Sequence, residues 1–292
     1  MDKPAGWTSH DVVARMRRLA GTRRVGHAGT LDPMATGVLV VGVGRATRLL
    51  TYITGADKEY LATVRLGQTT TTDDAEGEVL TSADASALVR EDVVAAASPL
   101  TGDIEQVPSA VSAVKVDGVR AYARVRAGED VVLAARPVHV AVFEVGDLRP
   151  AGQVDVAVDV DVRVVCSSGT YVRALARDLG AALGVGGHLT VLRRTRVGGF
   201  GLADAQTLDD LAATDPAVPL PVTSPAAAAS AVMATRSVTD AEARELGFGR
   251  PVARRDEPDE RPVAALAPDG TLVAVLTAAG DRLRPVLVLA PA

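Results

Sequence analysis

The residue with the clearest chemical potential is Asp32, in the middle of a glycine-spaced stretch that runs from 24 to 39. Pro33 follows it and disfavours the α region for Asp32, so we expect an extended backbone there. Three glycines that permit turns or close backbone approach lie in the stretch: Gly26, Gly29 and Gly37. An apolar run, 38–41, comes directly after. The pattern predicts a carboxylate at the tip of a loop that feeds a buried strand, although an isolated Asp-Pro usually only initiates a turn.

The stretch closely resembles the catalytic motif of the bacterial tRNA pseudouridine synthase B (TruB) family, G-T/A-L-D-P-x-A-T-G-x-L, in which the aspartate is the nucleophile. The resemblance covers most of residues 2–200 through five separated motifs in the family's order. The other four are DKPAGWTS from Asp2, LGQTTTTDDAEG from Leu66, SAVKVDGVRAY from Ser112 and LRRTRVG from Leu192. In the family an apolar strand usually precedes the first motif, so either a strand is missing here or the start codon was chosen late.

The resemblance implies an isomerase that converts uridine to pseudouridine at position 55, in the T-arm loop of tRNA. This reaction breaks the glycosidic N–C bond, turns the base and joins the sugar to C5. It transfers no electrons and no phosphate, so we expect no cofactor. It requires a nucleophile or base, an extruded target base and exclusion of water. Asp32 fits the first role only as an ionised carboxylate, and a buried carboxylate stays ionised only beside a cation.

Arg173, in a T-Y-x-R motif, is the cation that the resemblance places beside Asp32, although an arginine there could also be a helix-surface residue. Tyr171 and Arg173 point to one side only if their segment is extended. We therefore predict that the strand continues to about Arg173 and that the helix begins there, even though the apolar helical pattern starts at Val172. Tyr171 would then pack beside the acid.

The resemblance also implies four further substrate-binding residues. Tyr60, in the K-E-Y motif, is expected to stack on the flipped base and to help move the C5 proton, since stacking contributes about 1–3 kcal/mol per base. His27 is expected to support the RNA conformation rather than act as the base. Lys3 is expected to hold the active-site loop or a phosphate, and Leu192 to line the pocket. Tyr60 could equally be a half-buried strand residue, and a lone histidine such as His27 is more often structural.

Hydrophobic periodicity predicts the elements that must position these residues. Apolar residues at helical spacing predict a helix that begins at Thr8 or Ser9. We further expect a short helix over 46–53, a strand over 60–66, a polar loop over 67–77, a surface helix over 84–100 and a long antiparallel strand over 154–165. By resemblance, the fold class is α/β of the α+β type: a pseudouridine synthase fold with a mixed, largely antiparallel central sheet flanked by helices.

We expect two domains, a catalytic domain over 1–222 and a small, mostly β, PUA-like RNA-binding domain over 223–292. Residues 213–229 are expected to form a linker. An RNA-gripping insertion is expected at about 104–130, where Ala110-Val111 departs from the family pattern, which more often has a small residue and then an aromatic one. In the tail, a hairpin plus another strand is predicted over 263–289.

The composition argues against disulfides, metal sites and membrane segments in this chain. Its single cysteine, Cys166, excludes intrachain disulfides and Cys-based zinc sites, and the dispersed histidines have no metal-ligand spacing, so we expect no metal. No membrane span or signal peptide is visible, and we expect a cytoplasmic monomer with no obligatory protein partner.

The charge distribution favours an RNA partner despite a net charge of −5. Residues 1–60 carry nine basic and five acidic side chains, whereas residues 73–105 carry one basic and nine acidic ones. Binding to phosphates depends on the local field rather than on the total charge. Two alternatives stay open: a guide-RNA-dependent synthase of the dyskerin type, and a non-catalytic RNA-binding protein. Met34-Ala35-Thr36 and the absence of Lys-rich tails argue against the first, and an acid retained with its arginine and tyrosine argues against the second.

Overall fold

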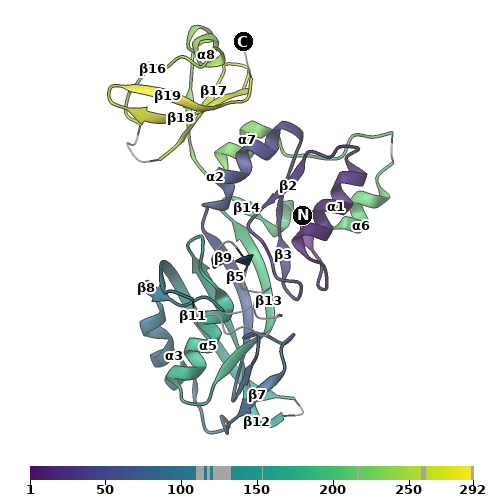
Figure 1. The fold of residues 1–292 in the computed structure, drawn as a ribbon, viewed down its shortest axis with the longest axis vertical. Coiled ribbons are helices and arrows are strands. Elements are labelled where there is room, and N and C mark those ends of the chain that lie inside the picture. Colours follow the sequence, from purple (N-terminus) through teal and green to yellow (C-terminus); the bar gives the residue numbers. More distant parts are fainter. Residues whose placement is uncertain are drawn as a thin grey trace.

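A mixed sheet of eight strands forms the centre of the molecule (Figure 1). This computed structural model describes residues 1–109, 115–116, 119–120, 133–152, 154–215, 217–257 and 261–290. The strand order is β1-β3-β13-β5-β12-β11-β8, with β14 beside β13. The strands are β1 (Asp2–Lys3), β3 (Thr36–Val38), β5 (Lys58–Leu66), β8 (Gly102–Gln106), β11 (Arg136–Ala151), β12 (Val154–Cys166), β13 (Gly187–Val197) and β14 (Phe200–Gly201). The β3–β13 pair is parallel, and the neighbouring pairs are antiparallel. The predicted fold class is confirmed.

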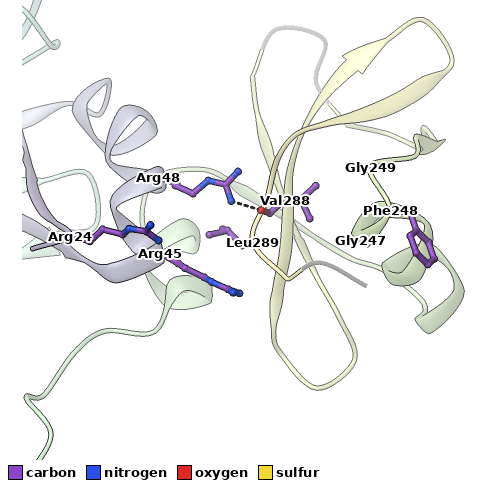
Figure 2. Close-up of a pocket in the computed structure, with 8 residues that line it drawn as sticks. All are labelled: Arg24, Arg45, Arg48, Gly247, Phe248, Gly249, Val288 and Leu289. Carbon is purple, nitrogen blue, oxygen red and sulfur yellow. Dashed lines mark hydrogen bonds between the residues drawn. The ribbon is translucent and has the colours of Figure 1, made fainter. Parts of the chain in front are cut away.

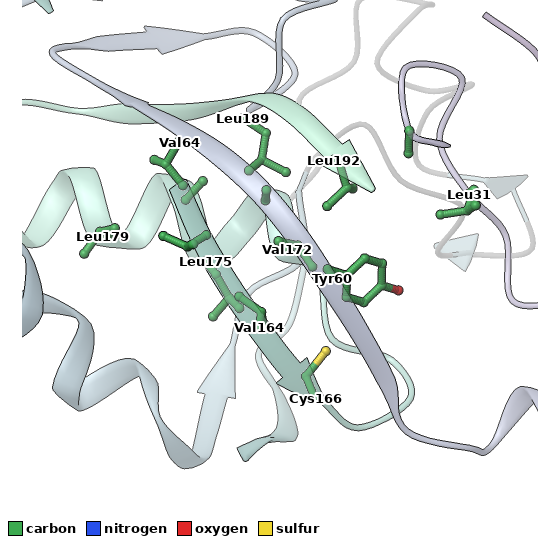
Figure 3. Packing of buried hydrophobic residues seen from close by; sticks show 14 of the residues in the cluster. Leu31, Tyr60, Val64, Val164, Cys166, Val172, Leu175, Leu179, Leu189 and Leu192 are labelled. Atoms are coloured by element: carbon green, nitrogen blue, oxygen red, sulfur yellow. The ribbon is translucent and has the colours of Figure 1, made fainter. Parts of the chain in front are cut away.

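β12 has one buried apolar face and one polar face, as its alternating valines predicted. Val160, Val162 and Val164 are at most 3% exposed, while Asp159 on the opposite face forms an ion pair with Arg65 of β5 at 2.8 Å. Residues that alternate along a strand point to opposite faces of the sheet. The buried face packs against α5 (Val172–Ala182), and Figure 3 shows this layer with Leu175 and Leu179 from the helix.

The predicted N-terminal helix is present as α1 (Ser9–Leu19), and its first turn explains where it starts. Thr8 and Asp11 form a capping box, in which each side chain accepts the backbone N–H of the other residue. A capping box satisfies N–H groups that have no partner within the helix. The predicted short helix is also present, as the 3₁₀ turn η1 (Gly44–Leu49) followed by α2 (Leu50–Thr54).

Two predicted element boundaries are wrong, the start of the surface helix and the end of the long strand. The surface helix starts only at α3 (Arg90–Ala97), followed by η2 (Ser98–Leu100), because the Asp84 and Asp92 carboxylates accept N–H groups in the preceding turns. The strand expected to reach Arg173 ends at Cys166.

A turn separates that strand from α5, and Tyr171 is the N-cap residue of the helix. The side-chain amide of Gln106 accepts the Tyr171 N–H at 2.8 Å and donates to its carbonyl at 3.1 Å, which holds Tyr171 outside the helix. The helix begins at Val172, one residue before the predicted start and where the apolar helical pattern starts.

Two small two-stranded sheets complete the part around the central sheet. β2 (Val25–Ala28) pairs with β4 (Val40–Val43). The loop that contains Asp32 connects β2 to β3, which comes before β4 in the chain. β6 (Gln68–Thr70) pairs with β7 (Val79–Ser82), so the predicted polar loop contains a strand. The short elements η3 (Leu202–Asp204) and α6 (Leu208–Ala213) follow β14.

The expected RNA-gripping insertion lies largely outside the described residues, which include from it the end of β8 and the antiparallel pair β9 (Lys115–Val116) and β10 (Val119–Arg120). In the part of the chain that is described, no helix is long and apolar enough to cross a bilayer.

The C-terminal part is a five-stranded sheet of order β15-β17-β18-β19-β16. Its elements are β15 (Ala234–Ser237), α8 (Asp240–Gly247), β16 (Val252–Ala253), β17 (Val263–Leu266), β18 (Leu272–Ala279) and β19 (Arg282–Val288). The predicted hairpin plus strand is present. The predicted linker contains a helix, α7 (Pro225–Ser230), because Ser224 caps it and four alanines favour it. One hydrophobic cluster joins Leu49 and Ile53 to Leu272 and Leu287, so this sheet packs on the η1–α2 segment.

Gly37 gives a direct test of how tightly β3 and β13 approach each other. Its φ is +101°, and a Cβ atom there would overlap the backbone carbonyl of Arg194. Gly44 also has a positive φ, +62°, but a Cβ atom there would meet nothing within 4 Å. We expect Gly44→Ala to cost about 1–2 kcal/mol of unfolding free energy, for backbone conformation alone.

Gly37→Ala should cost clearly more than Gly44→Ala, because the steric overlap adds to the conformational cost. Urea denaturation of the two variants measures the difference. Equal losses of stability would contradict the close approach.

Candidate active site

Lys3 of β1 fixes the Asp32 loop from one side. Its side chain is fully buried, and the ammonium donates to the carbonyl oxygens of Trp7, Pro4 and Pro33 at 2.6, 2.9 and 3.1 Å. Burial lowers the pKa of Lys3 to about 8, partly offset by the charge of Asp32. Of the two roles expected for Lys3, this geometry supports holding the loop, since three carbonyls already occupy the ammonium.

Arg194 of β13 fixes the same loop from the other side. It is also fully buried, and its guanidinium donates to the carbonyls of Val38, Gly29 and Thr30 at 2.7, 2.9 and 3.4 Å. Sequence reasoning missed this residue, although the basic pair in the L-R-R-T motif was the signal. Two buried cations thus hold the loop by its carbonyl groups, and these hydrogen bonds offset part of the cost of burying each cation.

The expected ion pair between Asp32 and Arg173 is present and bidentate. Arg173 Nε lies 3.0 Å from one carboxylate oxygen and Nη2 lies 3.3 Å from the other. The Arg173 side chain is 5% exposed, whereas the Asp32 side chain is 35% exposed. Bidentate pairing fixes the orientation of a carboxylate as well as its charge. One side of Asp32 is therefore held, and the carboxylate is still accessible from solvent.

A second carboxylate that sequence reasoning missed shares the same guanidinium. Asp74, with a side chain that is 3% exposed, lies 3.4 Å from Arg173 Nη1. The same Nη1 donates to the Thr72 carbonyl at 2.9 Å, and Asp74 accepts the N–H of Glu76 at 3.0 Å. Asp74 belongs to the polar motif after Leu66, which was the available signal. The pair Asp74–Arg173 holds the guanidinium in place, and Arg173 in turn orients Asp32.

Tyr60 and Leu192 lie next to this loop, on β5 and β13. They are 7% and 5% exposed and belong to one cluster with Leu31 and Val172. In Figure 3 the Tyr60 ring lies at the Leu31 end of that cluster. Burial raises the pKa of Tyr60, an effect that nearby Arg194 partly offsets, so the phenol is protonated at neutral pH. Tyr171 is half-buried before α5, and its packing beside Asp32 stays a prediction.

His27 is half-buried on β2 and contacts a residue that sequence reasoning set aside. The rings of His27 and His10 meet edge to face, 5.7 Å apart. Burial lowers the pKa of His27, and the neighbouring His10 and Arg194 lower it further. The ring is therefore neutral at pH 7 and adds no charge to the loop. Within the described residues, no group of three or more metal-binding side chains is placed to hold an ion.

Comparisons with protein families match this chain to one known group. The model described as "TruB family pseudouridylate synthase (N terminal domain)" matches residues 17–172. Two C-terminal models follow it: "tRNA pseudouridylate synthase B C-terminal domain" at 173–216, and "tRNA Pseudouridine synthase II, C terminal" at 233–290.

Individual relatives agree with the family models. The chain is 59% identical over 300 residues to the tRNA pseudouridine synthase B of Arthrobacter sp. (strain FB24), covering 100% of this chain and 95% of that protein. It is 56% identical over 301 residues to the protein of the same name from Mycobacterium avium (strain 104), with coverage of 100% and 95%. Among solved structures, the archaeal box H/ACA sRNP Nop10-Cbf5 complex matches with a TM-score of 0.73 and 25% identity, over 99% of this chain and 85% of that one.

The shared guanidinium predicts a large and specific loss of stability. Arg173→Met leaves the Asp74 carboxylate buried without its cation, which should cost about 3–5 kcal/mol of unfolding free energy. Arg149→Gln is the matched control, because it breaks an exposed pair with Asp161 whose side chains are 47% and 59% exposed. That control should cost no more than about 1 kcal/mol.

Urea unfolding at neutral pH compares the two variants. If Arg173→Met is no more destabilising than Arg149→Gln, the ion pair between Arg173 and Asp74 does not contribute to the stability of the fold.

Proposed function

Because the chain belongs to the TruB family of pseudouridine synthases, we propose that it isomerises uridine to pseudouridine in tRNA, at position 55 in the T-arm loop. The observation that carries the proposal is the Asp32 carboxylate, paired bidentately with a buried arginine and still 35% exposed. A protein that only bound RNA would gain nothing from such an acid, because a carboxylate repels phosphates.

In this proposal Asp32 acts at the junction between sugar and base of an extruded uridine. The bond between N1 and the sugar carbon breaks, the base turns, and a bond forms from that carbon to C5. The C5 proton leaves and N1 gains one, so the product is an isomer and no co-reactant is needed. Asp32 serves as the nucleophile, and its negative charge is stabilised by Arg173.

The remaining residues bind the flipped nucleotide and shape its site. Tyr60 supplies an aromatic face and a protonated hydroxyl, and Leu192 supplies an apolar wall beside it. Tyr171 packs beside the acid, and His27, neutral on β2, supports the RNA conformation. Lys3 acts through the loop: it keeps Pro33, and therefore Asp32, in place.

The proposal extends to the organisation of the chain. Residues 1–222 form the catalytic domain, with the RNA-gripping insertion at about 104–130, and residues 223–292 form the PUA-like RNA-binding domain. The enzyme works as a monomer, without an obligatory protein partner. The archaeal relative, by contrast, is a Nop10-Cbf5 complex of a box H/ACA sRNP. A requirement for guide RNA would place this chain with the guide-dependent alternative instead.

The decisive variant is Asp32→Asn. It keeps the shape of the side chain and removes its charge, so tRNA affinity should change by less than about threefold while pseudouridine formation falls below detection, since a neutral amide is not a nucleophile. Asp209→Asn is the control, because Asp209 is exposed in the first turn of α6.

The assay is pseudouridine mapping on an unmodified tRNA transcript after incubation with the purified protein. An Asp32→Asn variant that still forms pseudouridine would contradict the assignment of Asp32 as the nucleophile. Product formed only when a guide RNA is added would favour the guide-dependent alternative.

The Tyr60 hydroxyl has a separate test. Tyr60→Phe keeps the stacking face, so tRNA affinity should be within about twofold of the parent enzyme. If the phenol moves the C5 proton, the single-turnover rate should fall by about 100-fold, the lower end for losing a proton-transfer group. An unchanged rate would limit Tyr60 to stacking.

A further inference from the structure

The end of β8 and the residue after it hold the start of α5 at two points. Gln106, the last residue of β8, is 2% exposed, and its side-chain amide bonds both the N–H and the carbonyl of Tyr171, at 2.8 and 3.1 Å. The carbonyl of Val107 accepts a hydrogen bond from Arg177 Nη2 at 2.8 Å. An amide that uses its acceptor and its donor on one residue fixes that residue in two directions. The helix is therefore held both before and after Arg173.

Arg177 also holds the loop over 72–74. Its Nη1 lies 3.5 Å from a carboxylate oxygen of Asp73, and the two side chains are 29% and 17% exposed. Asp73 has a φ of +59°, and among the described residues it is the only one other than glycine with a positive φ. This left-handed conformation is uncommon outside glycine and persists where surrounding contacts hold it. The Asp73 carbonyl accepts the Leu189 N–H at 3.1 Å, so both the backbone and the side chain of the turn are held.

The left-handed turn lies between the two residues that hold Arg173. The Thr72 carbonyl and the Asp74 carboxylate lie 2.9 and 3.4 Å from Arg173 Nη1. Arg173 and Arg177 are four residues apart in α5, a spacing that puts two side chains on the same face of a helix. A shift of that face, or of the turn, would move the guanidinium that binds Asp32 through two contacts.

We propose that Gln106 and Arg177 are positioning residues for the isomerisation. They fix α5 and the left-handed turn, so that Arg173 keeps Asp32 in the orientation that its reaction requires. The inference rests on the proposed function, since the orientation of Asp32 matters to a rate only if Asp32 reacts. A displacement of about 1 Å in a reacting group can lower a rate by about 100-fold. Loss of either residue should therefore affect the chemical step rather than RNA binding.

The experiment measures tRNA affinity and the single-turnover rate of pseudouridine formation at saturating enzyme, for the full-length protein. Gln106→Met and Arg177→Met keep an unbranched side chain and remove the hydrogen bonds described above. Each should lower the rate by about tenfold or more, while tRNA affinity stays within about twofold of the parent. A purely structural role would lower the rate only as far as it lowers the folded fraction, which circular dichroism measures.

Two other arginines provide matched controls. Arg65 pairs with Asp159 at 2.8 Å, and their side chains are 24% and 13% exposed, close to the exposures in the pair that Arg177 forms. Arg48 donates to the Val288 carbonyl at 2.7 Å, between η1 and β19 (Figure 2). Neither contact involves α5. Arg65→Met and Arg48→Met should therefore keep the parental single-turnover rate.

A crystal structure of each variant gives a readout that needs no activity. The contacts from Arg173 Nε and Nη2 to the Asp32 carboxylate, 3.0 and 3.3 Å in the parent, should be lost in both variants. A variant that keeps both contacts, or keeps the parental rate, overturns the role of its residue.

A loss confined to tRNA affinity, or an equal loss of rate in the controls, overturns the inference as a whole. If the parent makes no pseudouridine in any tRNA, the proposed function fails, whereas the variant structures still decide whether Gln106 and Arg177 orient Asp32.

Discussion

The guanidinium of Arg173 is the group on which the rest of the site depends. It is buried, and it forms ion pairs with both Asp74 and Asp32. A buried cation is stable only with partners that satisfy its donors, and a buried carboxylate needs a cation to stay ionised. The two acids differ in access: Asp74 is enclosed, while Asp32 is open to solvent. One carboxylate therefore has a structural role, and the other is free to meet a substrate.

The fold brings this group of charges together from distant parts of the chain. β1 supplies Lys3 and β13 supplies Arg194, and both bond the carbonyls of the loop around Asp32. The close approach of β3 to β13 at Gly37 places that loop next to the sheet. Tyr60 reaches the same region from β5 at the centre of the sheet. Strands of the sheet, rather than loops alone, therefore position the residues of the site.

Patterns in the sequence predicted the elements with strong periodicity. The alternating valines of β12, the capped start of α1 and the Asp32 loop all follow from local chemistry. Sequence could not place the end of β12, because the Gln106 amide that holds Tyr171 comes from a strand 65 residues earlier. Asp74 and Arg194 were missed for the same reason: their partners are distant in sequence, so their spacing carried no sign of the contact.

The most direct test of the account is a crystal structure of the enzyme bound to a T-arm stem-loop, in which one distance is measured. We predict an extruded uridine whose sugar–base junction lies about 3–3.5 Å from an oxygen of Asp32, with Arg173 still paired to that carboxylate. A target uridine that stays stacked in the loop, or that is bound far from residue 32, would contradict it.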